Sequence, residues 1–196
     1  MSLAIVNARL LDPATELDSP GAIFIEKGKI KEIRLGEEAT FPDAKETRDA
    51  GGLCLAPGLI DLRVKTGEPG AEHKETLETA SRAALAGGIT SFVVMPSTRP
   101  VIDDVALLQF ISDRARKTAK ARVYAAGALT VGLAGEAMAE LGLLAEAGAI
   151  LFTNGDIPVA NAQVMKRAMA YAAANGALVM SRPDERALTG SGVMNA

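Results

Sequence analysis

The sequence predicts an α/β fold, in which a short β-rich part precedes a regular alternation of strands and helices. After Pro57, short apolar runs typical of strands occupy residues 59–64, 90–95, 122–126, 149–153 and 177–181. Helical patterns separate these runs, so five strands alternate with four helices at intervals of about 30 residues. Alternation of this kind implies a parallel sheet with right-handed crossovers.

Residues 1–55 are expected to form a separate β part, and residues 56–196 the α/β part. A strand begins near Ala4, and two runs at 22–26 and 29–33 flank Lys27-Gly28, which is a hairpin signal. The second run alternates apolar and polar residues, so we expect a half-exposed strand. Another strand is expected at 53–55, where Cys54 lies between two leucines and is predicted to be a buried thiol.

The four helices are expected at about 74–87, 103–120, 136–147 and 159–175. Glycine follows the first, third and fourth of them, as is usual just past a helix end. Asp103 and Asp104 begin the second helix, where negative charge complements the helix dipole.

Composition excludes several classes of protein. The chain is 48% hydrophobic and 23% charged, with a formal net charge of −3, as in an ordinary globular protein. No basic cluster points to nucleic acid, and no apolar stretch reaches the roughly 18 residues that span a membrane. One cysteine fits a reducing cytosol, so we expect a cytoplasmic protein. The one histidine, His73, cannot alone build a zinc hydrolase site and is expected to have a structural or surface role.

Two architectures fit the alternation of strands and helices: an open doubly wound sheet and a (β/α)8 barrel. The doubly wound alternative is weakened because no Gly-x-Gly-x-x-Gly follows the first strand. Five strands cannot close an eight-stranded barrel. Either the sheet is open, or the chain stops within a longer fold.

The run PGLIDLRVKTGEPG at 57–70 resembles the signature of the amidohydrolase superfamily, and specifically of bacterial dihydroorotases. Their first barrel strand carries Pro-Gly-x-Ile-Asp-x-His-x-His, followed by Leu-Arg-Glu-Pro-Gly. Further matches follow in family order at 72–75, 86–90, 95–101, 127–133, 147–152 and 192–195. The resemblance implies a (β/α)8 TIM-type barrel, with about five of its eight units present, beside the N-terminal portion of a small β-sandwich.

The resemblance also implies where the family binds zinc, and other residues stand at those positions here. The two histidines of the first strand correspond to Arg63 and Lys65, and the fifth-strand histidine to Arg182. Asn154 takes the place of the bridging carboxylate, and Asp156 lies two residues beyond it. Arginine keeps its proton, and lysine becomes a ligand only after a large pKa shift. We therefore expect no metal, no other cofactor and no catalytic residue.

Two substrate-binding positions of the family are replaced as well. The arginine that pairs with the substrate carboxylate corresponds to Gly67, and the asparagine of the Met-Pro-Asn-Thr block to Ser97. Glycine offers no charge-assisted contact to a carboxylate. The combined replacements predict that the family reaction is lost.

The resemblance implies a role for such an inactive homologue in pyrimidine biosynthesis. Some bacteria hold a chain of this kind in complex with aspartate transcarbamoylase, so we expect the catalytic chain of that enzyme as partner, with self-association as a further contact. One alternative is an active cyclic amide hydrolase with an altered site, either metal-free or with one metal at Asp156, Asp184 or Glu185.

The other alternative is an anion-binding sensor. Arg63, Lys65 and Arg182 would place up to three cations at one mouth of the barrel. They either pair with acids that line the same mouth or bind a phosphate or carboxylate ligand.

Overall fold

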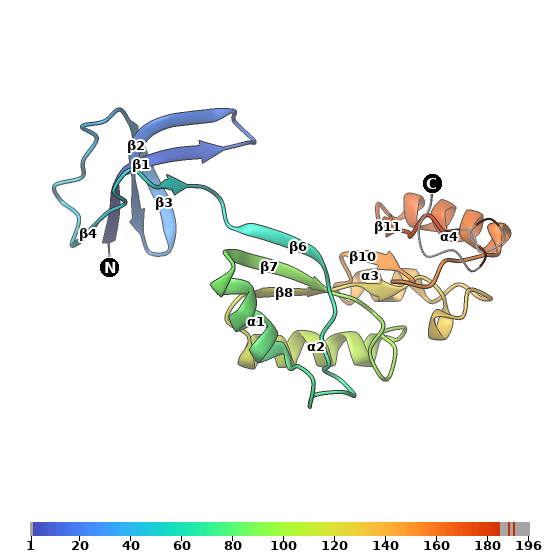
Figure 1. The fold of residues 1–196 in the computed structure, drawn as a ribbon. Coiled ribbons are helices and arrows are strands. Elements are labelled where there is room, and N and C mark those ends of the chain that lie inside the picture. Colours follow the sequence, from blue (N-terminus) through green and yellow to red (C-terminus); the bar gives the residue numbers. More distant parts are fainter. Residues whose placement is uncertain (1, 185–187, 189, 191–196) are drawn as a thin grey trace. The chain divides into compact units, whose positions relative to one another are not determined.

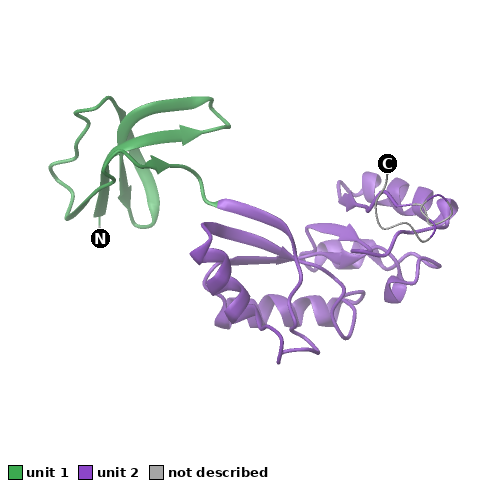
Figure 2. Ribbon diagram, in the orientation of Figure 1, with its two compact units in different colours: residues 1–58 green, residues 59–196 purple. Residues whose placement is uncertain are grey.

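The computed structural model describes residues 2–184, 188 and 190. The chain divides into two compact units, Met1–Gly58 and Leu59–Ala196 (Figure 1, Figure 2). The sequence predicts this boundary slightly earlier, between residues 55 and 56. The matches at 192–195 lie outside the described residues, as does Glu185.

The first unit is a sheet whose central strand is β1. Its strands are β1 (Ser2–Asp12), β2 (Leu17–Glu26), β3 (Lys29–Leu35), β4 (Glu46–Asp49) and β5 (Cys54–Leu55). The order is β3-β2-β1-β4, and β5 also pairs with β1. The pairs β1–β2 and β2–β3 are antiparallel, whereas β4 and β5 run parallel to β1. Ala4, Ala22 and Phe41 form one of its two small apolar clusters.

The predicted hairpin is confirmed. Glu26 pairs with Lys29, and the turn residues Lys27 and Gly28 have φ angles of 51° and 74°, as a tight hairpin turn requires. Two expectations for this unit are wrong. Every residue of β3 is exposed rather than every second one, because β3 is an edge strand that covers no core. Cys54 is exposed, because it lies on a two-residue strand at the margin of the sheet.

The second unit alternates strands and helices as predicted. Its elements are β6 (Leu59–Val64), α1 (Leu77–Ala86), β7 (Ile89–Val94), α2 (Val105–Thr118), β8 (Arg122–Ala125), β9 (Gly127–Ala128), η1 (Val131–Leu133), α3 (Leu141–Glu146), β10 (Leu151–Thr153), α4 (Ala162–Ala174) and β11 (Leu178–Met180). Two three-stranded sheets result, β6-β7-β8 and β9-β10-β11, and all their pairs are parallel.

The two sheets form one wall of strands in chain order. β8 and β9 are separated only by Ala126, whose N–H donates to Val94 O at 2.9 Å. On the other side, the N–H of Ile150 donates to Ala125 O at 3.2 Å. A doubly wound sheet reverses its strand order at a switch point, and no reversal occurs among the described strands of this unit. The sequential order is that of a barrel wall.

Local capping explains where the helices begin. α1 starts at Leu77 rather than near 74, because the Thr76 hydroxyl accepts the N–H of Thr79 at 3.2 Å as its N-cap. Asp104 caps α2 in the same way, by accepting the N–H of Leu107 at 2.9 Å. α3 is shorter than predicted, because part of the segment before it runs alongside Thr130. None of the described helices is long and apolar enough to cross a membrane.

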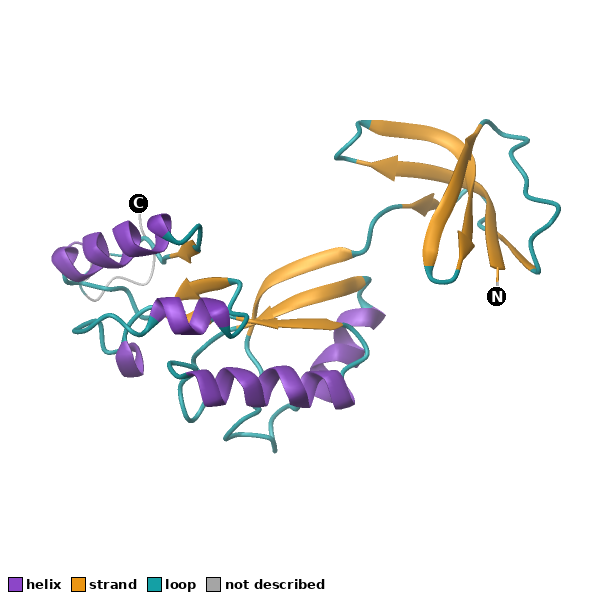
Figure 3. Cartoon of the chain, turned by 180° about the vertical axis from the view of Figure 1, so that it is seen from behind, coloured by secondary structure: helices purple, strands orange, loops and turns teal. Residues whose placement is uncertain are grey.

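The strands of the second unit bury alternate residues on opposite faces. Phe92 and Val94 of β7 belong to the main core, which lies between the strands and the helices. Figure 1 and Figure 3 show the chain from opposite sides, and in both views α1 and α2 lie against the same face of these strands. Val93 and Met95 face the other way and form a second cluster with Leu151. Both faces of the wall therefore carry apolar side chains, as in a barrel with a packed interior.

We expect Phe92→Ala to lower the free energy of unfolding of this unit by about 3–5 kcal/mol, because Phe92 is fully buried and truncation leaves a cavity. Phe110→Ala, at a helix position that is 46% exposed, is the matched control and should cost about 1 kcal/mol or less. Urea unfolding measures both. Equal losses of unfolding free energy in the two variants would contradict the position of Phe92 in the core.

Candidate functional site

The candidate site lies at the carboxyl ends of the parallel strands of the second unit. Arg63 is near the end of β6, and Lys65 follows it directly. Asn154 and Asp156 follow β10, and Arg182 follows β11. In barrel folds of this type, functional residues gather at that end of the strands, because the connecting loops there are free to vary.

Asp156 bridges two of the cations. Arg63 Nη2 donates to one oxygen of its carboxylate, and Lys65 Nζ donates to the other. The Lys65 hydrogen bond lowers the pKa of Asp156 below its ordinary value; the charges of Lys65, Arg63 and Arg182 act in the same direction, and partial burial opposes them. The acid therefore stays ionised between the two cations.

Arg182 contacts an acid of its own, since its Nη2 lies 3.2 Å from Oδ2 of Asp184. The three cations that the resemblance aligns with metal ligands thus each touch a carboxylate of this chain. This geometry favours internal pairing over a mouth that is free to bind an anion.

Asn154 serves as a buried structural residue. It is only 4% exposed, and its Oδ1 accepts the backbone N–H of Thr130 at 3.1 Å. Its Nδ2 donates to Thr130 Oγ1 at 2.8 Å and to Leu133 O at 3.3 Å. The amide thereby ties the segment after β9 to the end of β10, which consumes its hydrogen-bonding capacity.

These residues do not fit a zinc ion. Arg63 and Lys65 are protonated donors to Asp156, and the Asn154 oxygen already accepts a hydrogen bond inside the protein. Over the described part of the chain, no three His, Cys, Asp or Glu side chains gather as a metal site would require.

Position 67, which the resemblance aligns with a substrate-binding arginine, has no room for a side chain in this structure. A side chain at Gly67 would collide with Ala71 O and lie 2.6 Å from Glu75 O. The N–H of Ala71 donates to Gly67 O at 2.5 Å, so the loop folds back over this residue. An arginine at 67 would require a different path for residues 67–75. Ser97, which the resemblance aligns with a substrate-binding asparagine, is exposed on the loop after β7.

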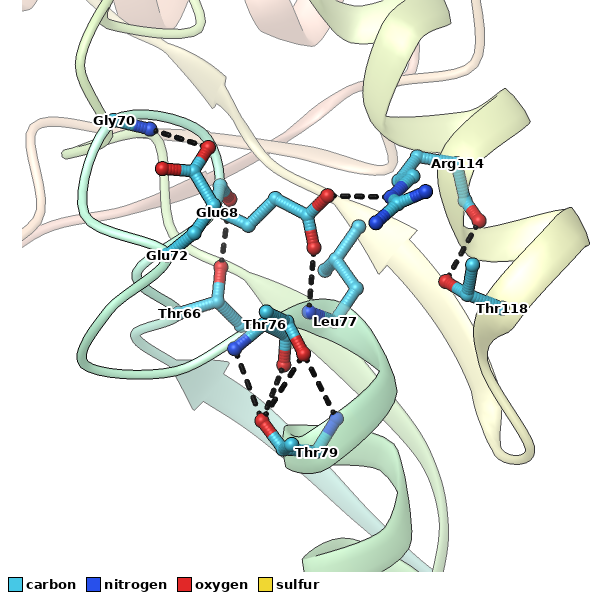
Figure 4. A network of polar contacts seen from close by, with 9 residues as sticks. All are labelled: Thr66, Glu68, Gly70, Glu72, Thr76, Leu77, Thr79, Arg114 and Thr118. Carbon is cyan, nitrogen blue, oxygen red and sulfur yellow. Dashed lines mark hydrogen bonds and ion pairs between the residues drawn. The ribbon is translucent and has the colours of Figure 1, made fainter.

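A buried carboxylate that sequence reasoning passed over holds this loop in place (Figure 4). Glu68 is 3% exposed, and its Oε1 accepts Arg114 Nε of α2 at 2.6 Å. Its Oε2 accepts the N–H of Leu77, the first residue of α1, at 2.9 Å. The Glu-Pro-Gly match contained this residue, but only the fold shows that it joins the loop to two helices.

Two further residues have local roles. Asp61 accepts the N–H of Arg63 with its own Oδ1 at 2.8 Å, which supports the end of β6. His73 is exposed on the loop before α1. It lies among residues that line a surface hollow described below.

Comparison with known proteins first defines the class. The structure resembles that of L-hydantoinase (dihydropyrimidinase) from Arthrobacter aurescens with a TM-score of 0.76 at 22% sequence identity, over 90% of this chain and 39% of that one. D-hydantoinase from a Thermus species matches with a TM-score of 0.51 at 25% identity, over 65% of this chain and 28% of that one. The fold is therefore that of the amidohydrolases.

Sequence relationships are more specific. The model of the dihydro-orotase-like family matches residues 52–196. A dihydroorotase of Pelobacter propionicus is 43% identical over 195 residues, which is 100% of this chain and 46% of that protein. One from Geotalea daltonii is 41% identical and is covered to 45%. The chain belongs to the dihydroorotase-like family, and it spans about half the length of these relatives.

Asp156→Asn should lower the free energy of unfolding at neutral pH by about 1 kcal/mol or less, because the ion pairs it removes are partly exposed. Since folding lowers the pKa of this carboxyl, its contribution is present above the ordinary value of 3.8 and is lost as the pH falls through the lowered value. The difference between parent and variant, from urea unfolding at several pH values, should shrink in acid. Asp113→Asn, on the exposed face of α2, is the control; a difference that persists unchanged at low pH contradicts the assignment.

Glu68→Gln should destabilise the protein by about 2 kcal/mol, because it leaves the Arg114 contact without its counter-charge. Glu72→Gln is the matched control: this exposed residue accepts the Gly70 N–H, which an amide oxygen can also accept. The charge of Glu72 also attracts His73 and Arg114, so the control measures the loss of that attraction without the loss of the Glu68 hydrogen bonds. Thermal unfolding distinguishes them, and equal shifts would exclude an anchoring role for Glu68.

Proposed function

We propose that this chain is a catalytically inactive dihydroorotase homologue with a structural role in pyrimidine biosynthesis. One observation carries the proposal: Asp156 is held by Arg63 and Lys65, at the positions where the family has its first two metal ligands. Without a metal, the hydrolysis of a cyclic amide lacks the ion that activates water and polarises the carbonyl.

We also propose that the wall of strands is part of a (β/α)8 barrel. The sequential strand order and the apolar second face support this extension. Leu59, Ile60 and Leu62 of β6 are 61%, 66% and 54% exposed, although they lie on a strand of the wall. Apolar side chains on an open strand edge favour cover by further protein.

The proposed partner is the catalytic chain of aspartate transcarbamoylase, whose assembly this chain would support, with self-association as a second contact. The scaffold is retained while the chemistry of the site is replaced, which is the pattern of a protein selected for its surface rather than its reaction. The competing hypothesis is an active hydrolase with an altered site, and it is supported by the relatives, which are named dihydroorotases. Such a site would have to free Asp156 from its two cations or recruit Asp184, which contacts Arg182.

The metal content of the purified chain, after incubation with excess zinc and removal of unbound ion, should be below about a tenth of an equivalent. The reason is that arginine and lysine stand where imidazoles are needed. Elemental analysis measures it. One or two tightly held equivalents, together with hydrolysis of dihydroorotate, would establish the altered enzyme instead.

Mixing with the aspartate transcarbamoylase catalytic chain at micromolar concentration should give a complex larger than either component. Size-exclusion chromatography with light scattering measures its mass. Bovine serum albumin in place of the catalytic chain is the control. An unchanged mass of each component would count against the assembly role, whatever the metal content.

A further inference from the structure

A second cationic feature lies beside the Asp156 cluster. Residues after β6, the loop before α1 and the loop after β7 line a hollow of about 620 Å³. Its charged members are Lys65, Lys74, Glu75 and Arg99, and His73 lies beside them. Gly67 and Ser97, which the resemblance aligns with substrate-binding residues of the family, line the same hollow. His73, Lys74, Glu75 and Arg99 lie in segments that match the family, but the resemblance assigns them no binding role.

The charge of this hollow is only partly balanced. Lys65 is held by Asp156, but the salt bridges found among the described residues include neither Lys74 nor Arg99. Glu75 is the one acid that lines the hollow within the described chain. Two cations from different loops therefore face the same space with a single carboxylate beside them.

The two walls are fixed against each other by backbone contacts. The N–H of Arg99 donates to Pro69 O at 3.1 Å. A side chain on Gly70 would collide with Arg99 O and lie 2.7 Å from Arg99 Cβ, so only glycine allows this approach. Glu68, one residue before Pro69, anchors the same loop to α1 and α2. The backbone on both sides of the hollow is thus held in place before any ligand arrives, so binding has to order only the side chains of the cations.

The groups that line the hollow are those that recognise a small dianion. Arginine offers a planar fork of donors and lysine a compact ammonium, and both match the oxygens of a phosphate group. The exposed Ser97 hydroxyl in the same lining adds a neutral donor. The volume accommodates a phosphate or a small phosphate monoester.

We propose that this hollow binds a phosphate group, with Arg99 and Lys74 as its principal ligands. The hollow adjoins the three-cation mouth formed by Arg63, Lys65 and Arg182 and shares Lys65 with it. Its proposed ligands Arg99 and Lys74 are different residues, whereas acids of the chain already pair with the cations of the mouth. The proposal holds whether the chain is inactive or an altered enzyme, since no metal and no reaction step enters it.

The test is a titration of the ¹⁵N-labelled full chain with inorganic phosphate, followed by backbone amide shifts at constant ionic strength, with sodium chloride as the reference titration. A parallel titration with glycerol 3-phosphate distinguishes free phosphate from a phosphate ester as the better ligand. We expect saturable shifts in residues 66–75 and 97–99. Arg99→Gln should weaken binding about tenfold, since it removes a charge-assisted contact.

Lys74→Gln is a second variant, on an exposed side chain whose loss leaves the backbone packing of Arg99 intact. Arg82→Gln, an exposed arginine of α1 outside the hollow, is the matched control and should bind like the parent. Binding that both hollow variants weaken and the control preserves supports the site. Shifts that never saturate with either ligand, or that the control weakens equally, overturn it.

Discussion

The bridge from Asp156 to Arg63 and Lys65 links the end of β6 to the loop after β10. The three side chains come from two of the parallel sheets, so the contact joins segments that share no strand pairing. A surface ion pair contributes little alone. Here, however, one carboxylate compensates two cations that would otherwise repel each other, and Arg182 adds a third charge nearby. The arrangement at the strand ends depends on this acid.

The loop between β6 and α1 is held by contacts on two sides. Glu68 fixes the loop to the two helices by its hydrogen bonds with Arg114 and Leu77. Gly67 allows the loop to fold back onto Ala71. The resemblance aligns Gly67 with an arginine of the family, and the structure gives the glycine a role in the path of the loop. Its missing side chain permits a loop path that a larger residue would block. The altered loop then lies beside Arg99 and forms one wall of the cationic hollow.

Much of the second unit follows from local pattern. The five predicted strands and four helices are present, because apolar periodicity and glycine stops act over a few residues. Errors arise where a distant contact decides. α3 is short because the segment before it pairs with Thr130, and β3 is exposed because it lies at a sheet edge. The residues near each segment in the sequence determine neither its pairing partner nor its position at the edge of a sheet.

The sequence by itself determined the alternation of strands and helices, the family resemblance and the residues that the resemblance aligns with metal ligands. Only the tertiary structure decided what those replacements contact. In the structure, Asp156 lies between Arg63 and Lys65, and Asn154 is buried against Thr130. Glu68 holds its loop to α2 through Arg114. The reason is physical: a parallel wall brings together the ends of strands that lie about 90 residues apart, and charge pairing depends on distance in space rather than along the chain.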